Sequence, residues 1–458
     1  MIKLFLFAFL GLISLPVCSQ IEGTLLSNWT DTTLVGSTSY NNSYNEVWGI
    51  AKDGREYAII GTTFGTHFID VTNPEQLEEL FVVKGATSGK EIVHRDYHDH
   101  NGFLYAVADE GFNSTLQIMD LSYLPDSISM IYDSRDLIYR THNIFIDSSS
   151  SIMYACVSNG ATVNYSPLRL FDISDPYEPK VISQHRIFGN LTLSEVHDAY
   201  VKNDTAYLNC GSRGLLIVDF NDPVEPELIT ILGTFDYPQS GYNHSGWLSD
   251  DGKTYFMADE TWGMDMKVVD VSDKLELVVI DTIDAGSTHP LTIPHNQIAH
   301  GNYLYTAYYY DGLQVYDIRD VNDIKRVMYY PTSNLETRRT YEGAWGIYPF
   351  LPSGNILVSD MQEGLFVIKA VEENSSTTDK SFQSKQDIQL FPQPAYQQFE
   401  LKGLDLKDKK IALLDQNGRI IRTLDQSGSY TILLAPGQYY IHIQGAKTYL
   451  TKSLMIAH

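Results

Sequence analysis

Short runs of alternating hydrophobic and polar residues, each ended by Gly, Asn, Asp or Pro, follow one another along residues 24–369. This alternation is typical of β-strands, and the 3.6-residue period of an amphipathic helix is absent. The runs recur in groups whose first strands share a position, or anchor, with spacings of 47, 47, 55, 47, 51 and 50 residues. The anchors are Trp48, Arg95, His142, His197, His244, His295 and Trp345.

Each group contains four predicted strands. A second apolar strand begins about ten residues after the anchor, and a fourth follows a turn that often contains Pro. The third strand ends in aspartate in six of the seven groups, at Asp70, Asp120, Asp172, Asp219, Asp270 and Asp317. Four short strands in each repeat of about 40 to 50 residues predict the blades of a β-propeller.

The seventh group ends after its third strand, at Phe366–Ile368, and therefore lacks an outer strand. Residues 24–29 precede the first anchor and have the character of an outer strand without a group of their own. Adding them to the seventh group removes an open sheet edge. The sequence thus predicts an all-β chain, with a seven-bladed β-propeller over residues 20–370 closed by strand 24–29.

The N-terminus predicts export. Lys3 is followed by an apolar run that ends at Val17, and Ser19 is a suitable residue before a signal-peptide cleavage site. We predict a signal peptide over residues 1–19. Cys18 leaves a lipid anchor open as an alternative, although Val17 is a poor fit before a lipid-modified cysteine. No later run is long and apolar enough to span a membrane, so we expect no transmembrane segment after signal removal.

Cleavage would leave Cys156 and Cys210, which lie in equivalent strands of successive groups. Their positions relative to the preceding tyrosines differ by one residue, so alternation sends them to opposite faces of their strands. We expect two free, buried thiols and no disulfide bond.

The composition limits the partners. With 57 Asp plus Glu against 32 Lys plus Arg, the net charge is −25, and no basic patch is visible in the sequence. We therefore expect no nucleic-acid partner. Residues 371–387 are polar and predict a linker, and residues 388–458 alternate as short strands that predict a small C-terminal β-sandwich.

The repeats resemble the LVIVD-repeat propellers, most clearly in Gly214–Asp219 and Gly312–Asp317, and the whole series resembles the choice-of-anchor B family. His94 is a departure, because that family leads one to expect Trp there. The resemblance implies no established catalytic activity. Motifs for a nucleophile elbow, a phosphate-binding loop, a zinc-protease helix or an EF-hand are not found.

Residues 388–458 resemble the type A C-terminal sorting domain of the type IX secretion system. The resemblance rests on Phe391–Ala395, where Gln393 replaces the more usual Asn, on Asp415–Arg419, on Gly437–Tyr440 and on Lys452–Met455. It implies export through the periplasm, recognition by the type IX secretion machinery, and release or attachment at the cell surface. An ordinary carbohydrate-binding or immunoglobulin-like sandwich is the alternative.

Four successive anchors are histidines, at His142, His197, His244 and His295. Because the first strand of each blade lines the propeller channel, we expect the four imidazoles to surround one axis. Imidazole binds Zn, Fe, Cu and Ni, so the histidines are candidate ligands of a divalent transition metal. Carboxylates considered as further or outer ligands are Asp96, Glu195, Asp198 and Glu342.

Two other roles for the four histidines stay open, because they could link neighbouring blades or line a pocket for an organic ligand. The cluster of His94, His98 and His100 fits a solvated turn, with metal capture as its alternative. The remaining anchors, Trp48, Arg95 and Trp345, are candidate ligand-binding residues at the channel mouth. Two functional hypotheses follow: an exported protein that binds an extracellular ligand or protein partner, and a metal-dependent enzyme that uses the histidines.

Overall fold

The computed structural model describes residues 21–161, 163–220, 229–237, 240–371, 389–391, 398–402, 410–414, 420–424, 428–431, 434, 437–445 and 448–456. The predicted signal peptide, Cys18 and residues 372–387 of the predicted linker lie outside these ranges. The chain divides into two compact units, Met1–Glu372 (the first unit) and Glu373–His458 (the second unit). All regular secondary structure in the described ranges is β-strand, which confirms the prediction of an all-β protein.

The described part of the first unit contains seven sheets of four or five strands and one two-stranded sheet. The first three sheets are β3 (Tyr44–Lys52), β4 (Arg55–Thr62), β5 (Gly65–Asp70) and β6 (Glu78–Lys84); β7 (Arg95–His100), β8 (Phe103–Ala108), β9 (Leu116–Asp120) and β10 (Ser129–Ser134); and β11 (Asn143–Asp147), β12 (Ile152–Gly160), β13 (Val163–Asp172) and β14 (Lys180–His185). The two-stranded sheet is β15 (Ile187–Phe188) and β16 (Leu191–Thr192).

Four further sheets follow in chain order. They are β17 (Asp198–Lys202), β18 (Thr205–Asn209), β19 (Leu215–Asp219) and β20 (Thr230–Phe235); β21 (Asn243–Leu248), β22 (Thr254–Asp259), β23 (Met266–Asp270) and β24 (Val278–Ile283); β25 (Gln297–His300), β26 (Tyr303–Ala307), β27 (Leu313–Asp317) and β28 (Lys325–Tyr330) with β1 (Ile21–Glu22); and β29 (Ala344–Tyr348), β30 (Ile356–Asp360) and β31 (Gly364–Ile368) with β2 (Leu25–Trp29). Strand β2 pairs antiparallel with β31, and β1 pairs parallel with β28.

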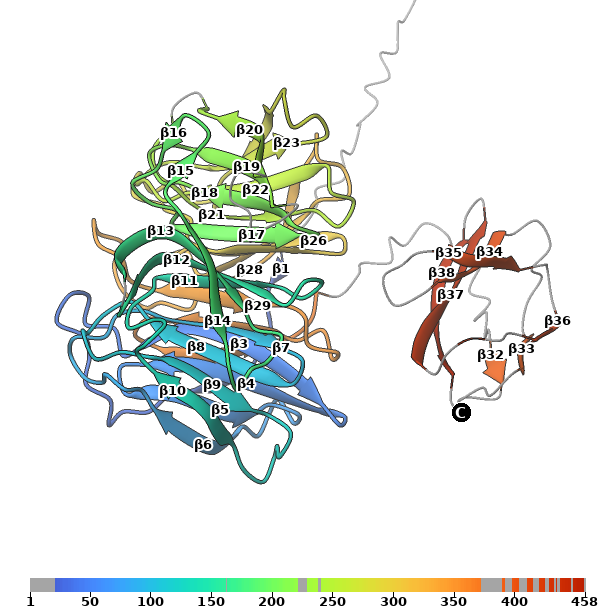
Figure 1. Ribbon diagram of the computed structural model, residues 1–458, viewed down its shortest axis with the longest axis horizontal. Helices are drawn as coiled ribbons and strands as arrows, with labels where there is room; N and C mark the ends of the chain where they lie inside the picture. Colours follow the sequence, from blue (N-terminus) through green and yellow to red (C-terminus); the bar gives the residue numbers. More distant parts are fainter. Residues whose placement is uncertain are drawn as a thin grey trace, which may run out of the picture. The chain divides into compact units, whose positions relative to one another are not determined.

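The first strands of successive sheets contact one another around the unit. Contacts join β3 to β7, β7 to β11, β11 to β17, β17 to β21, β21 to β25 and β25 to β29, and β29 also contacts β3. In Figure 1 the orange strand β29 accordingly lies beside the blue strand β3, although their residues are about three hundred positions apart. The first and last sheets of the unit are therefore neighbours.

Burial falls from the middle of each sheet to its outer edge. All residues of β5, β9 and β31 are buried, because neighbouring sheets cover both of their faces. The outermost strands β6 and β24 consist of exposed and partly buried residues, apart from the buried Ile283 at the end of β24. The continuous apolar runs and the alternating ones in the sequence correspond to these two environments.

The repeated aspartate forms a turn at the end of the third strand. Asp70 Oδ1 accepts a hydrogen bond from the backbone N–H of Thr72, two residues further on, at 2.9 Å. The same bond occurs at Asp120, Asp172, Asp270 and Asp317. An aspartate that caps its own turn in this way ends the strand and directs the chain back toward the fourth strand.

Cys156 and Cys210 are free, and both lie in one hydrophobic cluster. The two cysteines were expected on opposite faces of their strands. Neighbouring sheets pack through opposite faces, so this arrangement brings both side chains into the interface between the two sheets. Burial raises the pKa of both thiols well above the usual range.

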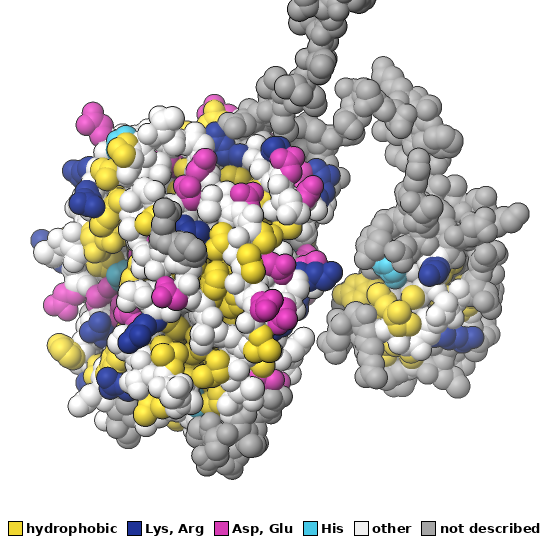
Figure 2. Space-filling view, turned by 90° about the horizontal axis from the view of Figure 1, so that it is seen from above, with side chains coloured by type: hydrophobic (Ala, Val, Ile, Leu, Met, Phe, Trp, Pro, Cys, Tyr) yellow, Lys and Arg dark blue, Asp and Glu magenta, His cyan; other side chains and the backbone are white. Residues whose placement is uncertain are grey.

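Acidic and basic side chains are interspersed over the described residues on the face of the first unit seen in Figure 2. No continuous basic patch is visible on that face. Within the described ranges, no helix has the length and apolar character needed to cross a membrane.

The second unit contains two sheets in its described residues. One is β32 (Gln389–Phe391), β33 (Gln398–Lys402) and β36 (Gly428–Thr431), and the other is β35 (Ile420–Leu424), β34 (Lys410–Leu414), β37 (Gly437–Gly445) and β38 (Thr448–Ile456). Tyr430 from the first of these sheets packs in one core cluster with Ile411, Leu413 and Ile441 from the second. The predicted motif Asp415–Arg419 and most of Phe391–Ala395 lie outside the described residues.

Candidate functional site

Six aromatic side chains form a closed circle in the channel of the first unit. The members of this histidine ring are His94, His142, His197, His244, His295 and Trp345. Successive ring centroids lie 4.9, 4.2, 4.1, 4.5 and 4.1 Å apart in that order, and 5.1 Å separates Trp345 from His94. Each member stands just before the first strand of its sheet or at the start of that strand, so six sheets contribute one side chain each.

Four of the five imidazoles are held through Nδ1. His197 donates from Nδ1 to the carbonyl oxygen of His244 at 3.0 Å, and His295 donates to the carbonyl of Trp345 at 2.6 Å. A carbonyl only accepts, so the neutral form of each imidazole carries its lone pair on Nε2. His142 Nδ1 bonds Asp109 Oδ2 at 2.8 Å, and His94 Nδ1 bonds Glu110.

The protonation of the imidazoles depends on these partners. Burial, followed by the neighbouring imidazoles, lowers the pKa of His197 and His244 well below the usual value, and burial lowers the pKa of His295 to about 3. Burial also opposes the charged form of His142, but the hydrogen bond and charge of Asp109 outweigh it and raise the pKa of His142 to about 9. At neutral pH His197, His244 and His295 are therefore neutral, whereas His142 carries a proton on both ring nitrogens.

A cavity of about 340 Å³ opens over the histidine ring. Besides the six ring members it is lined by Tyr40, Tyr242, Glu260, Tyr309 and Tyr341. Burial raises the pKa of the Glu260 carboxyl to about 7, although Tyr309 donates a hydrogen bond to it at 2.6 Å. Four phenol rings, one carboxyl group and five imidazoles thus face one space, which we call the histidine cavity.

A second cavity, of about 400 Å³, adjoins the first at Tyr40 and is called here the mouth cavity. Its walls carry hydroxyl, amide, guanidinium and carboxylate groups, from Thr38, Ser39, Asn41, Arg338, Arg339, Thr340 and Glu342. The Arg339 guanidinium lies over the Trp262 ring, 5.1 Å from its centroid, and Trp262 in turn contacts Tyr341. Aromatic faces and polar donors are therefore combined at the entrance.

Three groups in and beside the ring place potential metal-ligating atoms within 4.8 Å of one another. They are His142 with His197 and His244, His94 with Asp109 and His142, and His244 with Glu260 and His295. All four histidines predicted as metal ligands belong to at least one of these groups. The structure thus brings the predicted histidines together around one axis.

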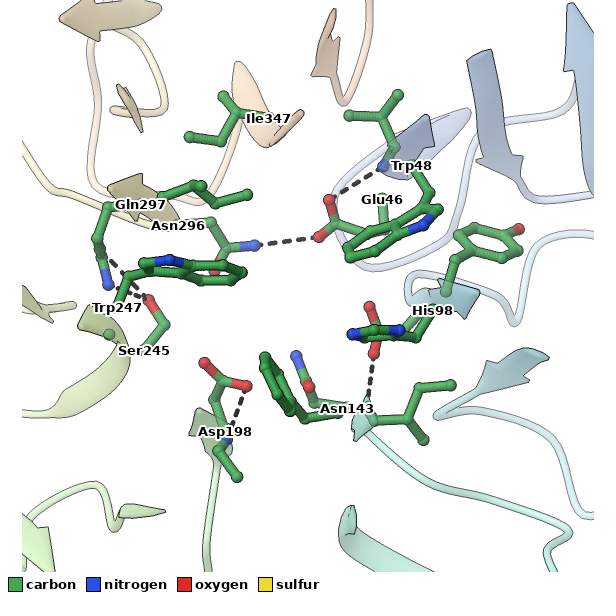
Figure 3. A pocket seen from close by; sticks show the side chains of 18 residues that line it. Glu46, Trp48, His98, Asn143, Asp198, Ser245, Trp247, Asn296, Gln297 and Ile347 are labelled. Atoms are coloured by element: carbon green, nitrogen blue, oxygen red, sulfur yellow. Dashed lines mark hydrogen bonds between the residues drawn. The ribbon is translucent and has the colours of Figure 1, made fainter. Parts of the chain in front are cut away.

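Further along the same first strands, the channel contains a smaller chamber of about 70 Å³. Figure 3 shows Glu46, Asp198 and Asn296 facing this carboxylate chamber, with the rings of Trp48 and Trp247 in its wall. Burial, followed by repulsion from Asp96, raises the pKa of Glu46 and of Asp198 to about 8. Burial raises the pKa of Asp96 itself to about 7.

These carboxylates link the sheets. Asp96 accepts the backbone N–H of Ile144 at 2.6 Å from the next sheet, and Glu46 accepts the Asn296 amide at 3.0 Å. Asp96 and Asp198 were expected to assist the histidines as further or outer metal ligands. They lie instead in the carboxylate chamber, where Asp96 links neighbouring sheets. Glu195 and Glu342 do not belong to any of the three groups either. Glu195 lies beside Tyr242, and Glu342 bonds Arg338 and Tyr310.

Two of the three predicted channel-mouth residues lie elsewhere. Trp48 stands in the middle of β3 and lies in the wall of the carboxylate chamber. Its Nε1 donates a hydrogen bond to Asp99 Oδ1 at 2.8 Å. Arg95 is buried and donates to the carbonyls of Thr62 and Thr87, so it ties neighbouring segments together and faces neither cavity. Trp345 alone lies in the histidine ring.

His94 takes the ring position that the sequence analysis gave to Arg95. The anchors align by spacing, but Arg95, the first residue of β7, points to the side of the strand opposite to His94, which directly precedes it. His98 and His100 lie within β7, so the prediction of a solvated turn is wrong for them. Burial lowers the pKa of both.

Asp109, Glu260 and Tyr309 were not among the residues predicted for the site. All three lie at the end of a second strand, directly after β8 and β22 and two residues after β26. A comparison of the residues that follow the second strands would have revealed them, because this position is polar or aromatic in several repeats.

No protein-family model and no curated protein matches the sequence. Among solved structures, the chain is similar to the periplasmic gluconolactonase PpgL of Pseudomonas aeruginosa, with 11% identity over 84% of this chain and 96% of that one and a TM-score of 0.51. It is also similar to U3-55K, with 8% identity over 74% and 100% of the two chains and a TM-score of 0.50. The Cps50 (Swd1) β-propeller domain of Myceliophteria thermophila matches at 13% identity over 75% and 100%, with a TM-score of 0.48. At these identities the similarities to the gluconolactonase and to U3-55K show the fold alone, a β-propeller.

Proposed function

We propose that this chain is an exported seven-bladed β-propeller that binds an extracellular ligand at the histidine-bearing end of its channel. Seven blades are supported by the seven sheets and by the contact of β29 with β3. In this account β2 is the outer strand of the last blade, as its pairing with β31 indicates. A strand from the N-terminus would then close the ring of blades and protect its edge.

The single observation that carries the binding role is the convergence of six sheets on the histidine cavity. About 340 Å³ is within the size range of small-molecule sites, and such sites combine aromatic walls with a few convergent polar groups. The opposite chamber of about 70 Å³ has room for solvent but not for an organic molecule of sugar size.

The ligand class follows from the chemistry of the two adjoining cavities. Aromatic rings of Tyr40 and Tyr341 in the wall offer stacking surfaces, while Thr38, Asn41 and Arg339 supply hydroxyl, amide and guanidinium donors. This combination suits a polyhydroxylated molecule, whose C–H faces stack on rings and whose hydroxyls need directed hydrogen bonds. We therefore assign the cavity to a carbohydrate ligand.

Titration calorimetry of the mature chain, residues 20–458, with glucose, galactose and glucuronate tests this assignment. We expect at least one sugar to bind, and the variant Tyr341→Ala to weaken that binding at least tenfold. Phe350→Leu is the matched control, because Phe350 packs on Trp247 at the other end of the channel. An absence of binding to all three sugars, or equal affinities in the two variants, would contradict the assignment.

Delivery is a separate part of the proposal. The apolar N-terminus suggests entry into the export pathway, and the resemblance of residues 388–458 to a type A sorting domain suggests passage through the type IX secretion machinery to the cell surface or medium. Deletion of residues 388–458 should leave a folded propeller inside the periplasm, detected by cell fractionation. Undiminished surface delivery of the shortened chain would refute this role.

A further inference from the structure

We infer that His142, His197 and His244 hold one divalent transition-metal ion at the base of the histidine cavity. The inference deepens the proposed function, because it names what a ligand entering that cavity would meet. It also explains why these three imidazoles converge, which the linking of neighbouring blades does not.

The spacing of the three imidazoles fits a common ion. Their ligating atoms already lie within 4.8 Å of one another. Nitrogen ligands lie about 2.0–2.1 Å from zinc, so two of them on a tetrahedral ion are about 3.4 Å apart. Side-chain movements of about 1 Å or less would close the group around a metal.

The orientation of two imidazoles is fixed in the manner typical of metal ligands. A ligating histidine usually donates its other ring N–H to a carboxylate or a backbone carbonyl. His142 bonds Asp109 through Nδ1, and His197 bonds the carbonyl of His244 through Nδ1. Nε2 of each has no hydrogen-bond partner among the described residues, and both side chains line the cavity.

The third imidazole, His244, presents Nε2 toward the cavity. His244 is 5% exposed, and the backbone of His295 lies beside its imidazole. Its Nε2 lies 3.9 Å from Glu260, too far for a hydrogen bond. Nε2 is therefore available to an ion in the cavity that His244 and Glu260 both line.

Linking of blades is the competing explanation, and it accounts for the Nδ1 atoms only. His197 and His295 do join neighbouring sheets through carbonyl bonds. A purely structural role, however, gives no reason for three imidazoles from consecutive sheets to bring their remaining nitrogens toward one point. The cavity in front of them is the space that an ion and its exchangeable ligand would need.

The donor set selects the class of metal. Three imidazoles suit zinc, copper or nickel, whereas calcium and magnesium require oxygen ligands. The two overlapping groups are weaker candidates, since Asp109 is already bonded to His142 and Arg140, and Glu260 already accepts from Tyr309. Three protein ligands leave a fourth position open toward the cavity, as in catalytic rather than structural zinc sites.

The test uses the mature chain, produced without a polyhistidine tag and freed of metal with a chelator. Dialysis against Zn²⁺ followed by elemental analysis should find one ion per chain, and Co²⁺ should give the visible absorption of a four- or five-coordinate site with nitrogen ligands. His197→Gln should abolish stoichiometric loading. The matched control is His289→Gln, which alters an exposed histidine outside the cavity.

Asp109→Asn keeps the inference testable if His197→Gln fails to fold, because Asn preserves the size of the side chain. It should weaken Zn²⁺ binding by about 10 to 100-fold, as loss of an outer-shell partner does. Absence of stoichiometric metal in the wild type, or equal loading of His197→Gln and His289→Gln, would overturn the inference. Sugar titrations on the metal-free protein separate the two proposals. If metal-free wild type still binds sugar and only Tyr341→Ala loses that binding, sugar binding depends on the cavity walls and not on the ion.

Discussion

Replacement of Glu46 by Gln should change how the stability of the propeller depends on pH. Glu46 shares the carboxylate chamber with Asp96 and Asp198. Burial and repulsion from Asp96 raise its pKa from 4.5 to about 8 in the folded chain. A carboxyl whose folded pKa is raised binds its proton more tightly in the native state. Its contribution to stability is therefore fully present below the unfolded pKa and is lost progressively as pH rises from there through the folded pKa.

The magnitude follows from proton linkage. Between pH 7 and 9 the unfolded chain carries an ionised Glu46 throughout, whereas the native chain passes from mostly protonated to mostly ionised around pH 8. Integration of this difference gives a loss of about 1.4 kcal/mol in the free energy of unfolding from Glu46 alone. Asp198, with a pKa of about 8, adds a similar loss, so the wild-type protein should be clearly less stable at pH 9 than at pH 7.

Guanidinium unfolding followed by tryptophan fluorescence measures this effect. All five tryptophans lie between Trp29 and Trp345, so the signal reports on the first unit. Glu46→Gln should lose about 1.4 kcal/mol less than the wild type between pH 7 and 9. The exposed Glu75→Gln serves as the control. If Glu46→Gln and the wild type lose the same free energy over this interval, the account of the carboxylate chamber is incorrect.

Three further outcomes are expected. Trp345→Ala should lower the free energy of unfolding by about 3–5 kcal/mol, because Trp345 is 6% exposed and its removal leaves a gap in the histidine ring; denaturant titration measures this. Cys156 and Cys210 should react with a thiol reagent only after denaturant is added, and a fast reaction in the native state would contradict their burial. A mature chain that begins at residue 30 lacks β1 and β2, so it should expose the edges of β28 and β31 and aggregate in light-scattering measurements, whereas an unchanged monomer would argue against closure by the N-terminal strands.

Much of the fold could be predicted from the sequence because the blade pattern is local. Alternating apolar runs give strands, and an aspartate such as Asp70 marks the end of a third strand through a hydrogen bond to its own turn. The pairing of distant segments could be predicted at one place only. The last repeat lacks an outer strand, and this pointed to residues 24–29 as the missing one.

The site was predicted less completely, because position along the first strand decides which end of the channel a side chain faces. Trp48 lies in the middle of β3 and reaches the carboxylate chamber, although its spacing from the next anchor is regular. A shift of one residue reverses the direction of a strand side chain, which explains why His94 enters the ring and Arg95 does not. Partners from the loops after second strands, such as Asp109, come close only in the folded ring of sheets.

Anomalous X-ray scattering from crystals of the mature chain grown with Zn²⁺ tests the central claim, that the histidine-bearing end of the channel is the binding site. Data collected above and below the zinc absorption edge locate the metal without reference to a model of the ligand. We expect one strong peak within bonding distance of His142, His197 and His244, facing the cavity lined by Tyr309 and Tyr341. A channel without a zinc peak, or a peak confined to the carboxylate chamber, would contradict it.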